Sequence, residues 1–194
     1  MATTAKILAF AGSARDGSWN RKLIRIAVEG ASEAGAEVTL IELRDFPMPL
    51  YNGDLEAAEG LPEHATRLQA LFAAHDGLLI SAPEYNSSVT PLLKNTIDWV
   101  SRPNGDAPSL KFIRGKTAGL VSTSTGALGG LRGLRHLREI FGNIGVTVIP
   151  DQTAVPSAAS AFDENGRLTD ARKEATVKAV GARLVSVTKA LAGV

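Results

Sequence analysis

Short apolar runs alternate along the chain with longer segments in which apolar residues recur every three or four positions. The short runs predict five strands: Lys6–Ala11, Glu37–Glu42, Gly77–Ala82, Thr117–Ser122 and Val146–Ile149. The longer segments predict five helices: Asn20–Glu33, Glu63–His75, Pro91–Ser101, Leu131–Ile144 and Thr169–Ala192. Thr90 suits the N-cap position of the third helix, because Pro91 fits its first turn. This alternation is typical of repeated βαβ units, so we expect an α/β protein with helices on both faces of a parallel sheet.

Five parallel strands can be wound in several orders. The order 2-1-3-4-5 reverses direction between the first and third strands and opens a crevice at their carboxyl ends. The loops after Lys6–Ala11 and Gly77–Ala82 then line the same crevice. The chain contains no repeat and no Pro/Gly/Ser-rich linker, so we expect one domain over residues 1–194. Long connections are commonly functional or lie at interfaces, and three are predicted: Arg44–Leu61, Pro103–Lys116 and Pro150–Arg167.

Composition narrows the classes of protein and partner. Of 194 residues, 44% are hydrophobic and 21% are charged, which is typical of a globular protein. The 21 Lys and Arg residues nearly balance the 20 Asp and Glu residues, without long runs of either sign, so neither nucleic acid nor a membrane is expected as a partner. The absence of cysteine excludes disulfides, thiolate metal sites and a cysteine nucleophile.

Two further patterns concern location and metals. The apolar run after Lys6 is too short for a secretory signal or a membrane span, so we expect a cytoplasmic protein. The three histidines lack acidic companions at metal-ligand spacing, and we therefore expect no metal site.

The loop after the first predicted strand, Gly12–Asn20, collects groups that bind anions. Backbone N–H groups before a helix favour a phosphate, and the hydroxyls of Ser13 and Ser18, the amide of Asn20 and the guanidinium of Arg15 add donors. Ser18 stands where a P-loop needs lysine, and no Gly-x-Gly-x-x-Gly occurs, which disfavours an NTPase and a Rossmann dinucleotide site. The alternative is a tight strand-to-helix turn with Ser18 as N-cap and Arg15 in solvent.

The loop after the third predicted strand makes the pattern specific. Ser13-x-Arg15-x-x-Ser18-x-Asn20, together with Pro83-Glu84-Tyr85-Asn86, Leu93-Lys94-Asn95 and Asp98-Trp99, resembles the NADPH-dependent FMN reductase family, with a closer match to its bacterial quinone- and chromate-reducing branch. The segment Ser122–Arg132 also resembles the family's loop after the fourth strand, so the resemblance covers nearly the whole chain. Thr90-Pro91-Leu92 departs from the Pro-Gly of some relatives.

The resemblance implies a flavodoxin-like fold, tightly bound FMN, and a homodimer or dimer of dimers. It assigns the FMN phosphate to Ser13, Arg15, Ser18 and Asn20. It places Pro83, Glu84, Tyr85 and Asn86 along the isoalloxazine, and Ser124 and Gly126 near its pyrimidine edge. In the competing interpretation, Pro83–Asn86 is a turn in which Asn86 hydrogen-bonds locally and Tyr85 packs on a neighbour.

The resemblance also implies the reaction. Hydride passes from NADPH, or NADH, to bound FMN and then to quinones, flavins or metal oxyanions such as chromate, so no catalytic side chain is required. The main alternative is a non-enzymatic flavodoxin-type electron carrier, but such carriers are typically acidic and this chain is near neutral. A phosphate-binding module without flavin is a third interpretation.

Two helices carry polar residues with an open interpretation. Lys94 and Asp98 are four residues apart and are expected to pair, while Trp99 is expected to pack in the core. Three arginines, Arg132, Arg135 and Arg138, lie on the predicted helix Leu131–Ile144. They are suited either to the phosphates of NADPH or an acidic neighbour, or to a solvated helix face.

Overall fold

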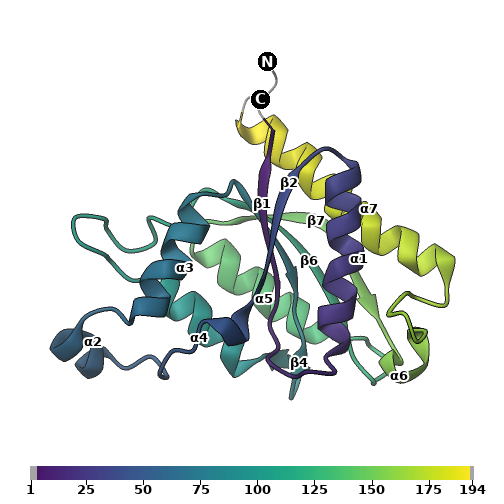
Figure 1. Cartoon of the computed structure of the whole chain (residues 1–194), viewed down its shortest axis with the longest axis horizontal. Coiled ribbons are helices and arrows are strands. Elements are labelled where there is room, and N and C mark those ends of the chain that lie inside the picture. Colours follow the sequence, from purple (N-terminus) through teal and green to yellow (C-terminus); the bar gives the residue numbers. More distant parts are fainter. Residues whose placement is uncertain (1–3, 193–194) are drawn as a thin grey trace.

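The computed structural model describes residues 4–192 and centres on a five-stranded parallel sheet (Figure 1). Its strands are β1 (Lys6–Ala11), β2 (Glu37–Glu42), β3 (Gly77–Ser81), β6 (Thr117–Thr123) and β7 (Thr147–Val155). Their order is β2-β1-β3-β6-β7, and all four pairings are parallel. This confirms the predicted order 2-1-3-4-5 and the flavodoxin-like fold. Met1–Thr3 and Gly193–Val194, the ends of the expected domain, lie outside the described residues.

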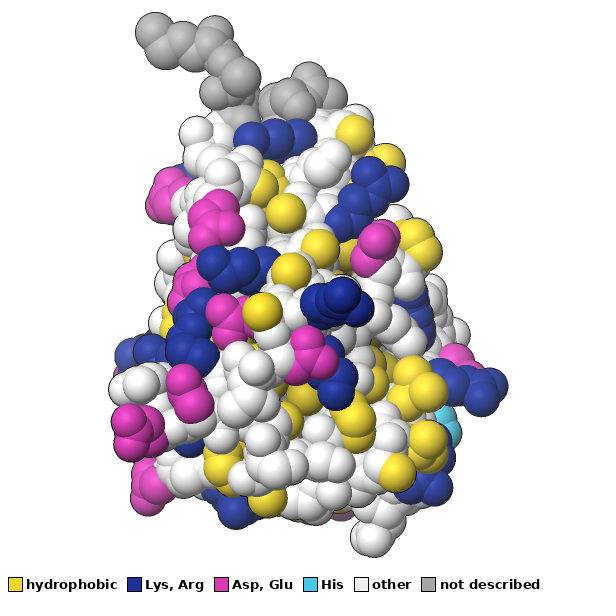
Figure 2. Space-filling model, turned by 90° about the vertical axis from the view of Figure 1, so that its right-hand side faces the viewer, with side chains coloured by type: hydrophobic (Ala, Val, Ile, Leu, Met, Phe, Trp, Pro, Cys, Tyr) yellow, Lys and Arg dark blue, Asp and Glu magenta, His cyan; other side chains and the backbone are white. Residues whose placement is uncertain are grey.

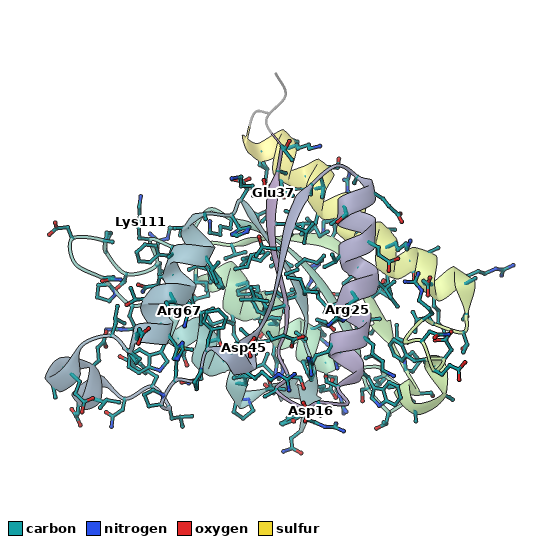
Figure 3. The ribbon with its side chains drawn as sticks, viewed as in Figure 1. Asp16, Arg25, Glu37, Asp45, Arg67 and Lys111 are labelled. Carbon is teal, nitrogen blue, oxygen red and sulfur yellow. The ribbon has the colours of Figure 1, made fainter. Side chains whose placement is uncertain are left out.

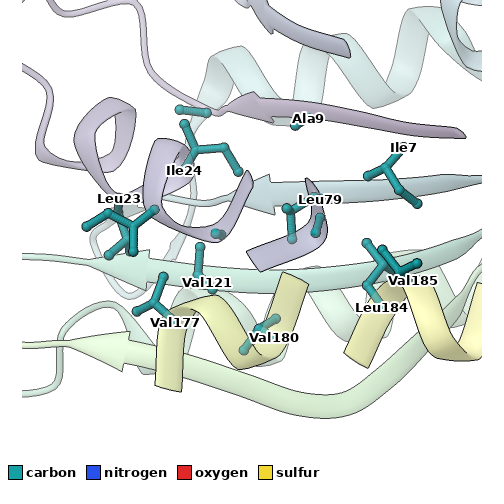
Figure 4. Close-up of a cluster of buried hydrophobic side chains, with 14 of the residues drawn as sticks. Ile7, Ala9, Leu23, Ile24, Leu79, Val121, Val177, Val180, Leu184 and Val185 are labelled. Atoms are coloured by element: carbon teal, nitrogen blue, oxygen red, sulfur yellow. The ribbon is translucent and has the colours of Figure 1, made fainter. Parts of the chain in front are cut away.

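Helices cover both faces of the sheet. One face carries α1 (Trp19–Glu33) and α7 (Ala171–Ala192), and the other carries α3 (Glu63–Ala73), α4 (Pro91–Val100) and α5 (Leu131–Asn143). Because side chains alternate across a strand, β1 supplies both cores. Ile7 and Ala9 face α1 and α7 (Figure 4), while Leu8 and Phe10 face the other three helices.

The helices α1 and α7 cross at very short range. A Cβ atom at Gly30 would collide with the carbonyl oxygen of Lys178, and one at Gly181 would collide with that of Ala27. Beside this crossing, Lys178 pairs with Glu33 at 2.7 Å. The side of the molecule that bears α7 shows charges of both signs between scattered apolar side chains (Figure 2), as expected for a solvated surface.

The last strand is longer than predicted. The sequence ends it at Ile149, but β7 continues through Pro150 to Val155. Pro150 is tolerated because β7 is an edge strand, and because the pairing register with β6 shifts between Ala118 and Leu120. Part of the predicted loop Pro150–Arg167 is therefore strand, and it also contains the short helix α6 (Ala158–Ala161).

Other short elements were missed within predicted loops. Arg44–Leu61 overlaps the 3-10 turn η1 (Leu43–Asp45) and contains α2 (Gly53–Glu59). No residue of α2 is buried, so it has no apolar stripe that the sequence could reveal. The helix predictions are confirmed within one or two residues at each end. Between residues 4 and 192, no helix has the length and apolar character needed to cross a membrane.

Candidate functional site

The loop between β1 and α1 lies at the carboxyl edge of the sheet and offers polar groups to the crevice. Ser13 and Ser18 are buried, whereas Arg15 is exposed. Ser18 occupies the N-cap position of α1, but its side chain makes no capping bond, nor does it hydrogen-bond to any other residue within 4–192. The alternative interpretation, in which Ser18 is the N-cap, is therefore confirmed for the backbone position of Ser18 but not for a capping side chain. Its hydroxyl is left available to a ligand.

A charged anchor holds this loop from behind. The Arg21 guanidinium donates to the backbone carbonyls of Arg15 and Asp16, both at 3.2 Å, and to the carboxylate of Glu42 at 2.9 Å. The Asp16 carboxylate also pairs with Arg44. Figure 3 shows Asp16 at the lower end of the sheet, beyond the end of β1. The anchor thus fixes the backbone whose N–H groups are the predicted phosphate donors.

Asn20 is buried and joins three elements. Its amide oxygen accepts hydrogen bonds from the Ser81 hydroxyl at 2.8 Å and from the Thr123 backbone N–H at 3.1 Å. Its amide nitrogen donates to the Thr123 carbonyl at 2.8 Å. Asn20 therefore ties the start of α1 to the ends of β3 and β6, which leaves one amide hydrogen for any ligand.

The segment predicted as a loop after β3 is a small hairpin. Its strands are β4 (Glu84–Tyr85) and β5 (Ser88–Val89), which pair antiparallel. The turn residues Asn86 and Ser87 both have positive φ, 49° and 68°, as a tight two-residue hairpin requires. The side chain of Tyr85 is half exposed. The hairpin presents this aromatic side chain and its own backbone beside the crevice.

The hairpin and the first loop are joined closely. The Thr90 hydroxyl donates to the Gly12 carbonyl at 2.7 Å and also caps α4 through the Leu93 N–H, confirming Thr90 as N-cap. A Cβ atom at Gly12 would lie 3.1 Å from Leu93 and 3.2 Å from Pro83. Glycine at position 12 therefore lets the two loops approach each other.

The carboxylate of Glu84, at the start of the hairpin, is bonded to α5. It accepts hydrogen bonds from the Gly133 N–H at 2.9 Å and from Arg132 at 3.0 Å. Burial opposes ionisation of Glu84, but these donors outweigh it, and the pKa of the carboxyl is lowered. The structure thus gives Arg132 an acidic neighbour, as one interpretation of the sequence expected.

The loop after β6 completes the rim. Ser124 accepts a hydrogen bond from the Gly126 N–H at 3.1 Å, and its carbonyl accepts one from the Ala158 N–H at 3.0 Å. The buried Ser122 hydroxyl donates to the Ala82 carbonyl at 2.6 Å, which joins β6 to the start of the hairpin. All three loops are therefore cross-linked at the same edge of the sheet.

A cavity of about 130 Å³ lies where these loops meet. The predicted residues that line it are Ser13, Arg15, Ser18, Asn20, Pro83, Glu84, Tyr85 and Ser124. Asn86 and Gly126 were predicted with them but do not line it. The cavity is also lined by three residues that the sequence did not single out: Trp19, Thr123 and Thr125. Each of them lies beside a residue that was predicted or within a segment that carries the family resemblance.

The polar residues of α4 have the structural roles expected of them. Lys94 pairs with Asp98 at 2.7 Å, and Trp99 is fully buried, with its indole N–H donating to the Pro49 carbonyl at 2.8 Å. The amide of Asn95 also donates to Pro49, at 2.9 Å. These contacts hold the segment before α2 against α4.

Comparison with known proteins agrees with the geometry. Residues 5–160 match the family described as NADPH-dependent FMN reductase. An NAD(P)H-dependent FMN reductase of Pseudomonas aeruginosa is 36% identical over 171 residues, and a quinone reductase of Pseudomonas putida is 36% identical over 172 residues. Each of these alignments covers 88% of both chains.

Among solved structures, the flavoenzyme NAD(P)H:(acceptor) oxidoreductase FerB from Paracoccus denitrificans has a TM-score of 0.79 and 26% identity, covering 95% of this chain and 97% of that one. The fold, the arrangement of the loops and these matches agree with the resemblance found in the motifs. The chain belongs to the NADPH-dependent FMN reductase family.

Proposed function

We propose that this enzyme binds FMN in the crevice at the carboxyl edge of β1, β3 and β6 and uses it to oxidise NADPH or NADH. The observation that carries the proposal is Ser18 at the start of α1, whose hydroxyl has no partner within residues 4–192 and which lines a cavity together with Ser13 and Arg15. The N–H groups of the first helical turn and the positive end of the helix favour an anion, so a free hydroxyl at this position suits a bound phosphate.

The residues present fit the phosphate end of FMN. Ser13, Arg15 and Ser18 supply two hydroxyls and a guanidinium, and the anchored loop backbone supplies N–H groups. We also assign Asn20 to the phosphate of FMN. Its amide already forms hydrogen bonds with Thr123 and Ser81, so it contributes through its one remaining amide hydrogen. A Cβ atom at position 12 would press on Pro83 and Leu93 and disturb this cradle.

The rest of the cofactor needs more room than the cavity gives. Ligand pockets usually measure about 300–1,000 Å³, so a space of about 130 Å³ suits the phosphate and part of the ribityl chain. We place the isoalloxazine along Pro83–Asn86, beside the exposed Tyr85, and its pyrimidine edge near Ser124 and Gly126. These residues follow β3 and β6, two neighbouring strands of one sheet, which supports one FMN-binding domain.

FMN, when bound, supplies hydride transfer from the nicotinamide and delivery of electrons to a second substrate. The chain's own residues bind and orient: Arg15 and the serines hold the phosphate, Arg21 fixes their loop, and the hairpin fixes the ring. Glu84 is already bonded to Gly133 and Arg132, so we assign it no proton transfer. No side chain is proposed as a catalytic acid, base or nucleophile.

The acceptors that we propose are quinones, free flavins and metal oxyanions such as chromate. The quinone reductase of Pseudomonas putida supports the first of these classes. We further propose a homodimer or dimer of dimers acting in the cytoplasm. Exposed apolar side chains beside the crevice, Tyr85, Leu128 and Leu131, support an assembly that covers this rim.

An electron carrier of the flavodoxin type would share the fold and the cofactor. Such a carrier docks on redox partners through an acidic surface, whereas the charged residues that line this cavity are Arg15 and a Glu84 already paired with Arg132. This difference favours an enzyme that takes hydride from a dinucleotide.

Purification tests the proposal directly. We expect the protein to carry FMN, to oxidise NADPH or NADH with a quinone acceptor, and to give parallel initial-rate lines, since donor and acceptor use the cofactor in turn. A colourless protein that cannot be reconstituted with FMN would contradict the proposed function. Intersecting lines would contradict only the alternating use of the site.

A further inference from the structure

The three arginines of α5 have different surroundings. Arg138 donates to the carbonyls of Ile149 and Pro150, at 2.8 and 3.1 Å, and so stabilises the irregular part of β7. Arg132 pairs with Glu84 at 3.0 Å. Arg135, between them, is exposed and makes no ion pair or side-chain hydrogen bond to any residue within 4–192. Only Arg135 therefore has an uncommitted charge among these three.

Arg135 lines a cavity of about 280 Å³ next to the turn of the hairpin. The remaining lining residues are Ser87, Arg132, His136 and Glu139. His136 and Ser88 lie 2.9 Å apart, from the ring Nδ1 to the hydroxyl oxygen, which ties α5 to β5 and fixes the wall of the cavity. The charge of Arg132 is already balanced by Glu84, so Arg135 and Glu139 decide which ligand fits.

The hairpin separates this cavity from the crevice. Tyr85 lines the crevice, and Ser87, two residues further along, lines the cavity. A ligand with one end beside Tyr85 reaches the cavity by crossing the turn. Because the cavity is slightly below the usual volume of a whole ligand site, it suits one end of an extended molecule.

We propose that this cavity receives the phosphorylated adenosine ribose of NADPH, with Arg135 bound to its 2′-phosphate. An arginine is the usual partner of that phosphate, and a carboxylate such as Glu139 accepts a hydrogen bond from a ribose hydroxyl. Since the Glu139 carboxylate also repels phosphate, the two residues act in opposite directions on the choice between NADPH and NADH. The inference rests on the proposed function, because it assumes that the nicotinamide reaches the crevice.

Direct binding to the holoprotein tests the site without turnover. The probes are adenosine 2′,5′-bisphosphate and 5′-AMP, which lacks the 2′-phosphate, measured by calorimetry. We expect Arg135→Gln to weaken binding of the bisphosphate by about tenfold, the equivalent of one charge-assisted hydrogen bond, and to leave 5′-AMP unaffected. The control is Arg172→Gln, which removes the same charge from an exposed position on α7 and should change neither affinity.

Steady-state kinetics give a second test, in which the two variants Arg135→Gln and Glu139→Gln should change the preference for NADPH over NADH in opposite directions. In Arg135→Gln the ratio of kcat/KM for NADPH to that for NADH should fall by about tenfold, and in Glu139→Gln it should rise. Equal losses in Arg135→Gln and Arg172→Gln, or an unchanged ratio in Arg135→Gln, would overturn the inference. The proposed function fails separately, if the protein binds no FMN; a protein that holds FMN but ignores the 2′-phosphate refutes only this inference.

Discussion

The first loop, Gly12–Asn20, and the hairpin, Glu84–Val89, face one crevice but are stabilised in opposite ways. In the first loop the backbone is held from behind by Arg21, while the side chains of Ser18 and Arg15 have no partner among residues 4–192. In the hairpin the charged side chain of Glu84 is turned inward and bonded to α5. The first loop therefore offers side chains to a ligand, and the hairpin offers its surface and backbone.

This difference matters for how substitutions should act. A change in the first loop removes a contact with the cofactor or loosens the loop that makes it. A change at Glu84 removes a contact within the protein, so it should alter stability before it alters cofactor affinity. Four variants, ordered from the largest expected effect on FMN or folding to the smallest, test this division.

Arg15→Ala should have the largest effect. The loss of charge-assisted hydrogen bonds to phosphate, worth about 1.5–3 kcal/mol, corresponds to FMN binding weaker by roughly 10- to 150-fold. Fluorescence titration of flavin-free protein measures the dissociation constant, and Arg172→Ala serves as the charge control. Unchanged FMN affinity in Arg15→Ala would exclude the first loop as the phosphate site.

Arg21→Ala should weaken FMN binding by about tenfold, since its hydrogen bonds hold the loop rather than the ligand. Riboflavin, which has no phosphate, should bind to wild type and variant alike. The matched control is Arg25→Ala, one turn further along α1, where the arginine lies 3.7 Å from Glu42 and makes no hydrogen bond to the loop. If riboflavin and FMN lose equal affinity in Arg21→Ala, the positioning role is wrong.

Glu84→Gln should lower the free energy of unfolding by about 1 kcal/mol at pH 7 while FMN affinity changes little. The folded pKa of Glu84 is lowered, so its contribution is complete above the unfolded value of 4.5 and is lost as pH falls from there through the folded pKa. Urea unfolding at pH 7 and at pH 4 should therefore show a smaller difference between wild type and variant at the lower pH. A large loss of FMN affinity instead would place the carboxylate against the ligand.

Tyr85→Ala should have the smallest effect, about threefold on the FMN dissociation constant, because an exposed aromatic contact contributes little beyond its buried area. Tyr85→Phe should bind FMN as the wild type does. Flavin fluorescence in the bound state is the sharper readout, since removal of a neighbouring ring should reduce its quenching. A loss as large as that of Arg15→Ala would remove the distinction between the two loops.

Most of the sheet could be predicted because each strand and each large helix buries an apolar face. Elements without a buried apolar face give no such pattern in the sequence. The helix α2 has no buried residue, and the strands of the hairpin are too short to show an alternation of apolar and polar residues. The continuation of β7 through Pro150 was missed because proline normally stops a strand. Only the position of β7 at the sheet edge, which is a property of the whole fold, permits it.

The site could be predicted to the level of segments but not of contacts. The motif residues Ser13, Arg15 and Ser18 meet Pro83 and Tyr85 around one cavity, as the strand order implies. The anchor formed by Arg21 and Glu42 could not be predicted, because it depends on how α1 lies beside β2. The role of Asn20 could not be predicted either, because an amide can bind a phosphate or cross-link strands. Only the folded structure brings Thr123 and Ser81 beside it.

The central claim is that the Gly12–Asn20 loop holds the phosphate of FMN. It is tested most directly by titrating flavin-free wild-type and Arg15→Ala protein with FMN and with riboflavin. We predict that wild type prefers FMN by at least about tenfold, the equivalent of one charge-assisted hydrogen bond, and that Arg15→Ala loses most of this preference. Equal affinity of the wild type for the two flavins, or an undiminished preference in Arg15→Ala, would contradict the account.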